Sequence, residues 1–120
     1  MGITYIEGKV TGPSGDQANA KFLVDSGARY TLLPHAIWRE IGLEPKRSMR
    51  FILADGTEVQ RNISECHIQL PQGEAHTPVI LGEERDAALL GVVTLEELGL
   101  VLNPFERTLE PAQMTLMLLI

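Results

Sequence analysis

The chain has 120 residues, 44% of them hydrophobic and 22% charged, a composition that fits one globular domain spanning residues 1–120. Its net charge of −6 argues against nucleic acid as a partner, because phosphate binding needs clustered Lys and Arg side chains. The single cysteine, Cys66, fits a reducing, cytoplasmic location, and the lack of a basic leader or of a bilayer-length apolar run predicts no membrane partner.

Two extended segments at the start of the chain predict a β-hairpin. Residues 3–10 alternate loosely between apolar and polar side chains, and residues 18–24 form the returning strand. The intervening segment, Gly12–Asp16, is dense in turn residues. The second strand ends in three bulky apolar residues at 22–24, which suits burial on both faces, and it leads directly into Asp25.

An acid at the end of a buried strand needs a reason, because burying a carboxylate costs free energy. Asp25 is followed by Ser26, Gly27 and Ala28, whose small side chains let the backbone turn sharply. Asp-Ser-Gly by itself is typical of an ordinary turn. Its flanks favour a buried loop instead, since Phe-Leu-Val precedes it and a second extended, apolar segment at 30–33 follows it.

A short helix and a second hairpin come next. Residues 34–41 begin with a proline, end before Gly42 and carry apolar side chains at helical spacing. Residues 49–53 and 58–63 are extended and flank an Ala-Asp-Gly-Thr sequence at 54–57, which predicts a β-hairpin.

Three extended segments follow the second hairpin. Residues 64–70 and 77–81 have the pattern of strands and are separated by a Pro-Gln-Gly turn. Residues 88–90 are apolar and extended, and Gly91 permits a close backbone contact. Cys66 and the three histidines do not match the spacing of a zinc site, so we expect no metal and no cofactor.

The last part of the chain combines a helix, two short extended pieces and an apolar tail. Thr94-x-x-Glu97 has the pattern of a capping box, which predicts a short helix that Gly99 ends. Residues 114–120 are almost entirely apolar, and such a tail must be buried in its own chain or against a partner. Together the elements predict an all-β fold, a closed or partly open barrel with eight or nine strands and two short helices.

The segment around Asp25 resembles the active-site loop of retroviral-type, or retropepsin-like, aspartic proteases. The signature of that family is two apolar residues, Asp, Thr or Ser, Gly and Ala, and residues 23–28 fit it. The family has a second motif, two apolar residues and a glycine that lead into a short helix, which is matched by Leu89, Leu90 and Gly91. The resemblance runs from Tyr5 to Leu109. Within the family, the chain is similar to small standalone, prokaryotic-type members.

The resemblance implies a homodimeric aspartic endopeptidase that acts on a peptide or protein substrate. Asp25 would supply one catalytic carboxylate and its symmetry mate the other, because the chain has only one Asp-Ser-Gly. Ser26 would hydrogen-bond across the dimer, and Gly27 would contact the substrate backbone. Residues 54–57 would be the tip of a flap, a hairpin that folds over the substrate, and residues 89–91 would support the loop. Substrate contacts would come from Leu23, Ala28, Ala54, Asp55, Gly56, Thr57 and Ile80.

Two features depart from the retroviral pattern. Arg29 and Tyr30 follow Ala28, where retroviral enzymes usually carry acids, so we expect side-chain preference and local ion pairs to differ. An extra polar turn precedes the apolar tail, so the interleaved terminal strands of the retroviral dimer are an open expectation for this chain.

Two other interpretations stay open beside the endopeptidase. One is a catalytically weak or inactive peptide-binding or dimerisation module of the same fold, which would capture peptides without cleaving them. The other is an unrelated small β-barrel that binds an apolar ligand. A monomer in which Asp25 has no neighbouring carboxylate would favour this last interpretation.

Overall fold

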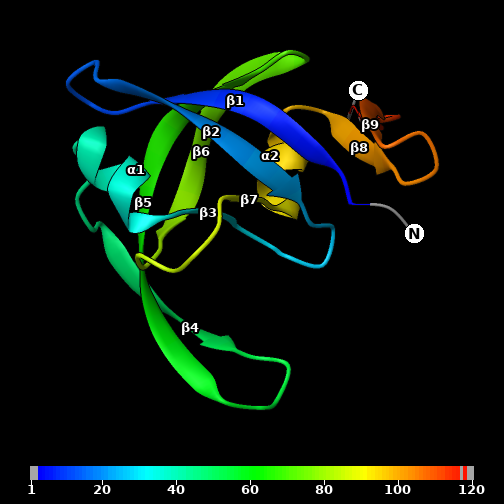
Figure 1. Ribbon diagram of the computed structural model, residues 1–120. Coiled ribbons are helices and arrows are strands. Elements are labelled where there is room, and N and C mark those ends of the chain that lie inside the picture. The colour runs from blue at the N-terminus through cyan, green and yellow to red at the C-terminus, as the bar shows by residue number, and fades with distance from the viewer. Residues whose placement is uncertain (1–2, 117, 119–120) are drawn as a thin grey trace.

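The computed structural model describes residues 3–116 and 118 (Figure 1). These residues form nine strands and two short helices: β1 (Tyr5–Thr11), β2 (Gln17–Val24), β3 (Thr31–Leu33), α1 (His35–Glu40), β4 (Arg47–Ile52), β5 (Glu58–Leu70), β6 (Gly73–Leu81), β7 (Leu89–Leu90), α2 (Val92–Glu97), β8 (Leu100–Asn103) and β9 (Thr108–Pro111). The predicted all-β class is confirmed. No helix in this part of the chain is long and apolar enough to cross a membrane.

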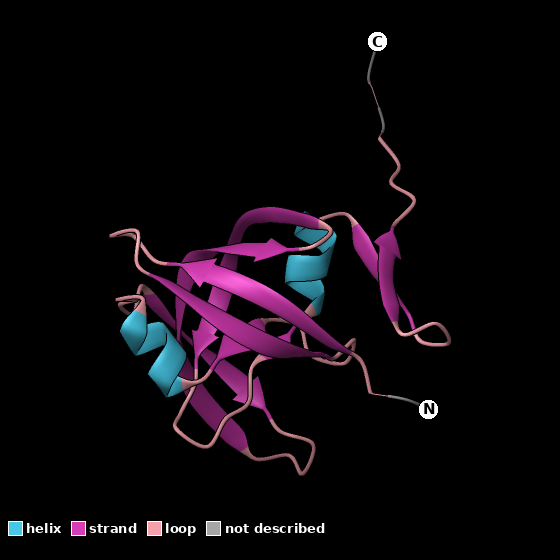
Figure 2. Cartoon of the chain, turned by 45° about the horizontal axis from the view of Figure 1, so that its top comes forward, coloured by secondary structure: helices cyan, strands magenta, loops and turns pink. Residues whose placement is uncertain are grey.

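Seven of the strands form one curved sheet in the order β1-β2-β7-β3-β6-β5-β4. An additional antiparallel pairing between β1 and β5 brings the sheet back on itself, which gives the barrel expected from the sequence. The strands β8 and β9 form a separate two-stranded sheet beside this body (Figure 2). The hairpin of β4 and the first half of β5 extends away from the body as a long arm (Figure 1).

Strand β7 is only two residues long, yet it joins the two halves of the sheet. It pairs in parallel with β2, where Leu89 lies opposite Leu23, and antiparallel with β3, where Leu89 lies opposite Leu32. The connection from β2 to β3 therefore leaves the sheet on one side of β7 and returns on the other. Both ends of the Asp25 loop are fixed by the same short strand.

The core is built from alternating side chains on the inner face of the sheet. On β2, Ala18, Ala20, Phe22 and Val24 are buried, whereas Leu23 between them is half-buried. The prediction that the end of this strand is covered on both faces is therefore only partly met. Burial of the apolar side chains removes them from water and is the main favourable term in folding. The larger fully buried apolar side chains elsewhere are Val10, Leu33, Ile41, Ile63, Ile68, Val79 and Leu90.

Strand β5 is a single strand of 13 residues where the sequence predicted two. Asn62 and Ser64 are residues common in turns, but both are paired in the sheet, Asn62 opposite Ser48 and Ser64 opposite Val79, so the strand continues through them. Its first half pairs with β4, and its second half pairs with β6 and β1. One continuous strand therefore connects the extended hairpin to the barrel.

Helix α2 begins before the residue that the capping-box pattern predicted. Gly91 is the N-cap residue, and the helix starts at Val92 without a side-chain cap hydrogen bond. Thr94 lies inside the helix, and its hydroxyl bonds to two buried hydroxyl groups of other elements. The capping-box prediction was wrong because these partners occupy the Thr94 side chain. Gly99 ends the helix, as predicted, at a φ of 68° that favours glycine.

The described apolar residues of the tail are exposed to solvent. Met114, Leu116 and Leu118 have exposed fractions of 69%, 82% and 71%. The segment after β9 leads away from the body (Figure 2). Residues 117 and 119–120 of the predicted buried tail lie outside the described residues. Of the two alternatives predicted for the tail, burial against a partner stays a prediction.

Stability should fall at alkaline pH because of Cys66, which is buried on β5. Burial, with a smaller effect from the charge of Glu65, raises the pKa of the thiol from 9.0 to about 12. Between these values the folded chain holds a proton that the unfolded chain has lost, so the free energy of unfolding decreases as pH rises. We expect wild type to lose more stability than Cys66→Ala between about pH 9 and pH 11 in urea unfolding. Equal slopes would contradict this.

Candidate active site

Asp25 directly follows β2, where the chain leaves the sheet. Its backbone N–H donates to the carbonyl of Leu90 at 3.2 Å, and its carbonyl accepts the N–H of Ala28 at 3.0 Å. The side chain is half-buried, and its Oδ1 accepts the N–H of Gly27 at 2.9 Å. The three small residues after Asp25 therefore form a tight turn that orients the carboxylate, while Ser26 and Gly27 are themselves exposed.

The segment from 88 to 93 holds the Asp25 loop in place. The N–H groups of Val92 and Val93 donate to the carbonyls of Ala28 at 2.9 Å and Arg29 at 2.8 Å. A Cβ atom at Gly91 would lie 2.4 Å from the carbonyl carbon of Tyr30 and 2.6 Å from its oxygen. This is the close backbone contact that a glycine was expected to permit here.

A cavity of about 420 Å³ lies between the Asp25 loop and the β4–β5 hairpin. The rings of Tyr30 and Phe51 meet edge to face across it, with their centroids 6.2 Å apart. Its walls are mainly apolar, with three charged side chains among them. The lining residues are Gly27, Ala28, Arg29, Tyr30, Leu32, Phe51, Leu53, Val59, Arg61, Ile80, Asp86 and Leu89.

The cavity gathers only some of the pocket residues that the sequence suggested. Ala28 and Ile80 line it, whereas Leu23 and the hairpin tip at 54–57 are not among the described residues that do so. Phe51 and Val59 were missed, although they lie opposite each other in the β4–β5 register and so share one face. The alternation of the two strands was the signal that would have found them.

The tip of the β4–β5 hairpin is held by its own hydrogen bonds. Leu53 N–H donates to the Thr57 carbonyl at 2.8 Å, and Thr57 N–H donates to Asp55 Oδ1 at 2.9 Å. Gly56 adopts a φ of 87°, which a residue with a side chain rarely takes. Hydrogen bonds from the side chain and then the backbone of Thr57 hold the pKa of Asp55 below its usual value.

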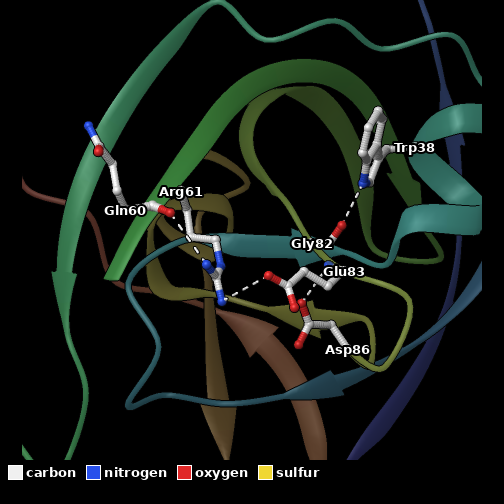
Figure 3. A network of polar contacts seen from close by, with 6 residues as sticks. All are labelled: Trp38, Gln60, Arg61, Gly82, Glu83 and Asp86. Carbon is white, nitrogen blue, oxygen red and sulfur yellow. Dashed lines mark hydrogen bonds and ion pairs between the residues drawn. The ribbon is translucent and has the colours of Figure 1, made fainter. Parts of the chain in front are cut away.

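A polar network fixes the base of the same hairpin (Figure 3). Arg61 on β5 lies 3.6 Å from the carboxylate of Glu83, whose backbone N–H donates to Asp86 Oδ2 at 2.6 Å. Trp38 on α1 donates from Nε1 to the carbonyl of Gly82 at 2.8 Å. The network joins β5, α1 and the loop after β6. The hairpin therefore has a tied base and an exposed tip, which suits a flap.

The other three aspartates serve turns of their own. Asp16 is exposed in the β1–β2 turn, Asp55 stabilises the hairpin tip, and Asp86 accepts the Glu83 N–H. In residues 3–116 and 118, no three His, Cys, Asp or Glu side chains gather as a metal site would require. Asp25 is thus the aspartate that directly follows a strand of the large sheet within the described residues, and the loop after it lines the apolar cavity through Gly27 and Ala28.

Residues 12–97 match the model of the family described as "gag-polyprotein putative aspartyl protease". A solved structure of similar fold is the solution structure of the simian foamy virus (mac) protease, with 20% sequence identity and a TM-score of 0.56. The match covers 79% of this chain and 94% of the viral one. At this identity the likeness shows the fold alone. No curated protein matches the sequence of this chain.

Gly91→Ala should destabilise the protein more than Gly15→Ala. At Gly91 the φ of −97° suits any residue, so the cost comes from the clash with Tyr30, and we expect about 3 kcal/mol or a failure to fold. At Gly15 the φ is 90° and the space is open, so only backbone strain of about 1 kcal/mol applies. Urea unfolding measures both losses. Similar values would show that Gly91 does not hold the loop.

Proposed function

The chain belongs to the gag-polyprotein aspartyl protease family, and from that membership we propose that it is an aspartic endopeptidase that works as a homodimer. The observation that carries the proposal is the position of Asp25. Its carboxylate accepts the N–H of Gly27, and the loop that carries it lines the apolar cavity through Gly27 and Ala28, opposite the β4–β5 hairpin. Family membership sets aside the interpretation as an unrelated ligand-binding barrel.

Peptide hydrolysis by carboxylates needs two of them close together, sharing one proton. The ionised carboxylate takes a proton from the attacking water, and the protonated one donates to the carbonyl oxygen as the tetrahedral intermediate forms. Two like charges this close cannot both ionise, so the pair titrates with two separated values. Which carboxylate acts as the base and which as the acid is set by the environment of the pair, because the two residues are the same type.

The second carboxylate is proposed to be Asp25 of another copy. The other aspartates are held in turns, and Ser26 and Gly27 beside Asp25 are exposed in the single chain. A two-fold axis that passes between two such loops would bring the two carboxylates together. Ser26 would then hydrogen-bond across the axis and keep both loops rigid.

Substrate binding is assigned to the cavity and the hairpin over it. The apolar walls contributed by Leu32, Phe51 and Ile80 would take an apolar side chain of the substrate. The backbone at 54–57 would hydrogen-bond the peptide after the flap closes, and Leu23 would contribute from the end of β2. Closure would exclude water from the dyad and strengthen its electrostatic effects.

Asp25→Asn should lower the rate at which a mixed peptide library is cleaved by on the order of a thousandfold, because it removes both the base and the acid of the dyad. The assay would cover about pH 4 to 7, where a carboxyl pair can share a proton. Asp16→Asn is the matched control, since it makes the same change in an exposed turn. It should cleave as wild type does.

The result also separates the endopeptidase from a binding module of the same fold. Products that vanish only in Asp25→Asn would establish the dyad and give the side-chain preference. Peptide capture by wild type and Asp25→Asn alike, without any product, would replace the proposal with the binding module.

Replacing Met114, Leu116 and Leu118 together by serine should weaken the dimer at least about tenfold, because these exposed apolar side chains are proposed to be buried against the second copy. Sedimentation equilibrium measures the dissociation constant. Phe105→Ser removes a side chain with 93% exposure from the β8–β9 turn and should leave that constant unchanged. An unaltered dimer in the triple variant would exclude the tail from the interface.

A further inference from the structure

A chain of hydroxyl groups crosses the core behind the Asp25 loop. The N–H of Gly91 donates to Thr31 Oγ1 at 3.1 Å, and Thr31 Oγ1 lies 2.6 Å from Thr94 Oγ1. Thr94 Oγ1 lies 2.7 Å from Thr77 Oγ1, which donates to Glu97 Oε1 at 2.9 Å. The chain thus links β3, α2 and β6 and ends at the surface on a carboxylate. We call these five residues the hydroxyl relay.

The three threonines of the relay are almost completely enclosed. Their exposed fractions are 0% for Thr31, 1% for Thr77 and 0% for Thr94. A buried hydroxyl without a partner destabilises a fold, so three together are tolerated only when each is hydrogen-bonded. Each of the three has two such partners within the relay. An apolar core would have avoided this requirement, which indicates that the relay has a role beyond filling space.

The carboxylate of Glu97 sets the direction of the hydrogen bonds between the three hydroxyl groups of the relay. An ionised carboxylate only accepts, so Thr77 must donate its single hydroxyl proton to Glu97. Its other acceptor, the Pro78 carbonyl, is farther away at 3.5 Å. Thr77 must then accept from Thr94, and Thr94 must accept from Thr31. Thr31 Oγ1, which donates its proton to Thr94, accepts the N–H of Gly91, a group that can only donate.

We propose that Glu97 is a positioning residue for the Asp25 loop and acts through the hydroxyl relay on Gly91. The residues on either side of Gly91 bind the loop, since Leu90 accepts the Asp25 N–H and Val92 donates to Ala28. A charged acceptor polarises a chain of hydrogen bonds and strengthens each of them. Holding the Gly91 N–H therefore holds the peptide groups that carry the loop.

The neighbouring Glu96 supplies a matched comparison. It lies on the same helix, carries the same charge and is exposed like Glu97, but its side chain forms no hydrogen bond or ion pair within the part of the chain that the structure describes. A general effect of removing negative charge from α2 would appear in both Glu96→Ala and Glu97→Ala. An effect through the relay would appear only in Glu97→Ala.

The first test measures the Gly91 amide and does not depend on catalysis. In Glu97→Ala we expect hydrogen exchange of this amide to be about tenfold faster and its proton resonance to move upfield. The reason is that the loss of the carboxylate at the far end of the relay makes Thr31 Oγ1 a weaker acceptor for the Gly91 N–H. In Glu96→Ala both should stay as in wild type. Thr94→Val interrupts the relay at its centre and should act like Glu97→Ala, whereas Thr94→Ser keeps the hydroxyl and should restore the wild-type amide.

The second test rests on the proposed function and uses peptide cleavage. Glu97→Ala should lower kcat about tenfold and change KM by less than about twofold, because the loop is misplaced while the cavity is untouched. Glu96→Ala should match wild type in both constants. Thr94→Ser should recover the kcat that Thr94→Val loses.

The two readouts separate the possible failures. A wild type without cleavage whose Gly91 amide responds to Glu97→Ala would overturn the proposed function and support the relay. An active wild type in which Glu97→Ala and Glu96→Ala give the same amide and the same kcat would overturn the relay. If Thr94→Val does not fold, the comparison of Glu97→Ala with Glu96→Ala still tests the relay. Both variants change exposed side chains, so we expect both to fold.

Discussion

The structure depends on the insertion of a two-residue strand, β7, between β2 and β3. A sharp loop at the end of a strand leaves backbone N–H and C=O groups without ladder partners, and such groups must be satisfied if they are shielded from water. Here the segment around β7 supplies them, since Leu90 accepts the Asp25 N–H and Val92 donates to Ala28. The contact is close enough that only a glycine fits at 91. The position of the carboxylate is therefore a consequence of sheet topology.

The same topology leaves one end of the β4–β5 hairpin, the proposed flap, with few neighbours. Strand β5 is continuous from the barrel into the hairpin, and Arg61 in its first half is tied to the loop after β6 through Glu83. Beyond that point the hairpin has only β4 as a neighbour in the sheet. Regions with few long-range contacts open at the lowest free-energy cost. The cavity is consequently bounded by one rigid wall, the Asp25 loop, and one wall that ends in an exposed tip.

Local patterns were sufficient to find the strands, the two helices and the loop, because turn residues and alternation act over a few residues. They failed where a side chain has a partner far along the chain. Thr94 and Glu97 have the spacing of a capping box, but Thr94 bonds to Thr31, which is 63 residues away, and Glu97 to Thr77. Phe51 and Val59 were identifiable in principle from their strands, yet the cavity that they line forms only when the hairpin lies over the loop.

Helix α2 connects the site to the part of the chain beyond the matched family span, which ends at residue 97. Its inner face carries Thr94, and its end at Gly99 accepts the N–H of Ala112 at 2.7 Å, just before the exposed apolar tail. Leu100 and Leu109 are buried, so the β8–β9 hairpin is packed and not free. The start of the tail is thus fixed relative to the helix that holds the Asp25 loop. A second copy bound through the tail would meet that loop in a defined geometry, which is what two carboxylates sharing one proton require.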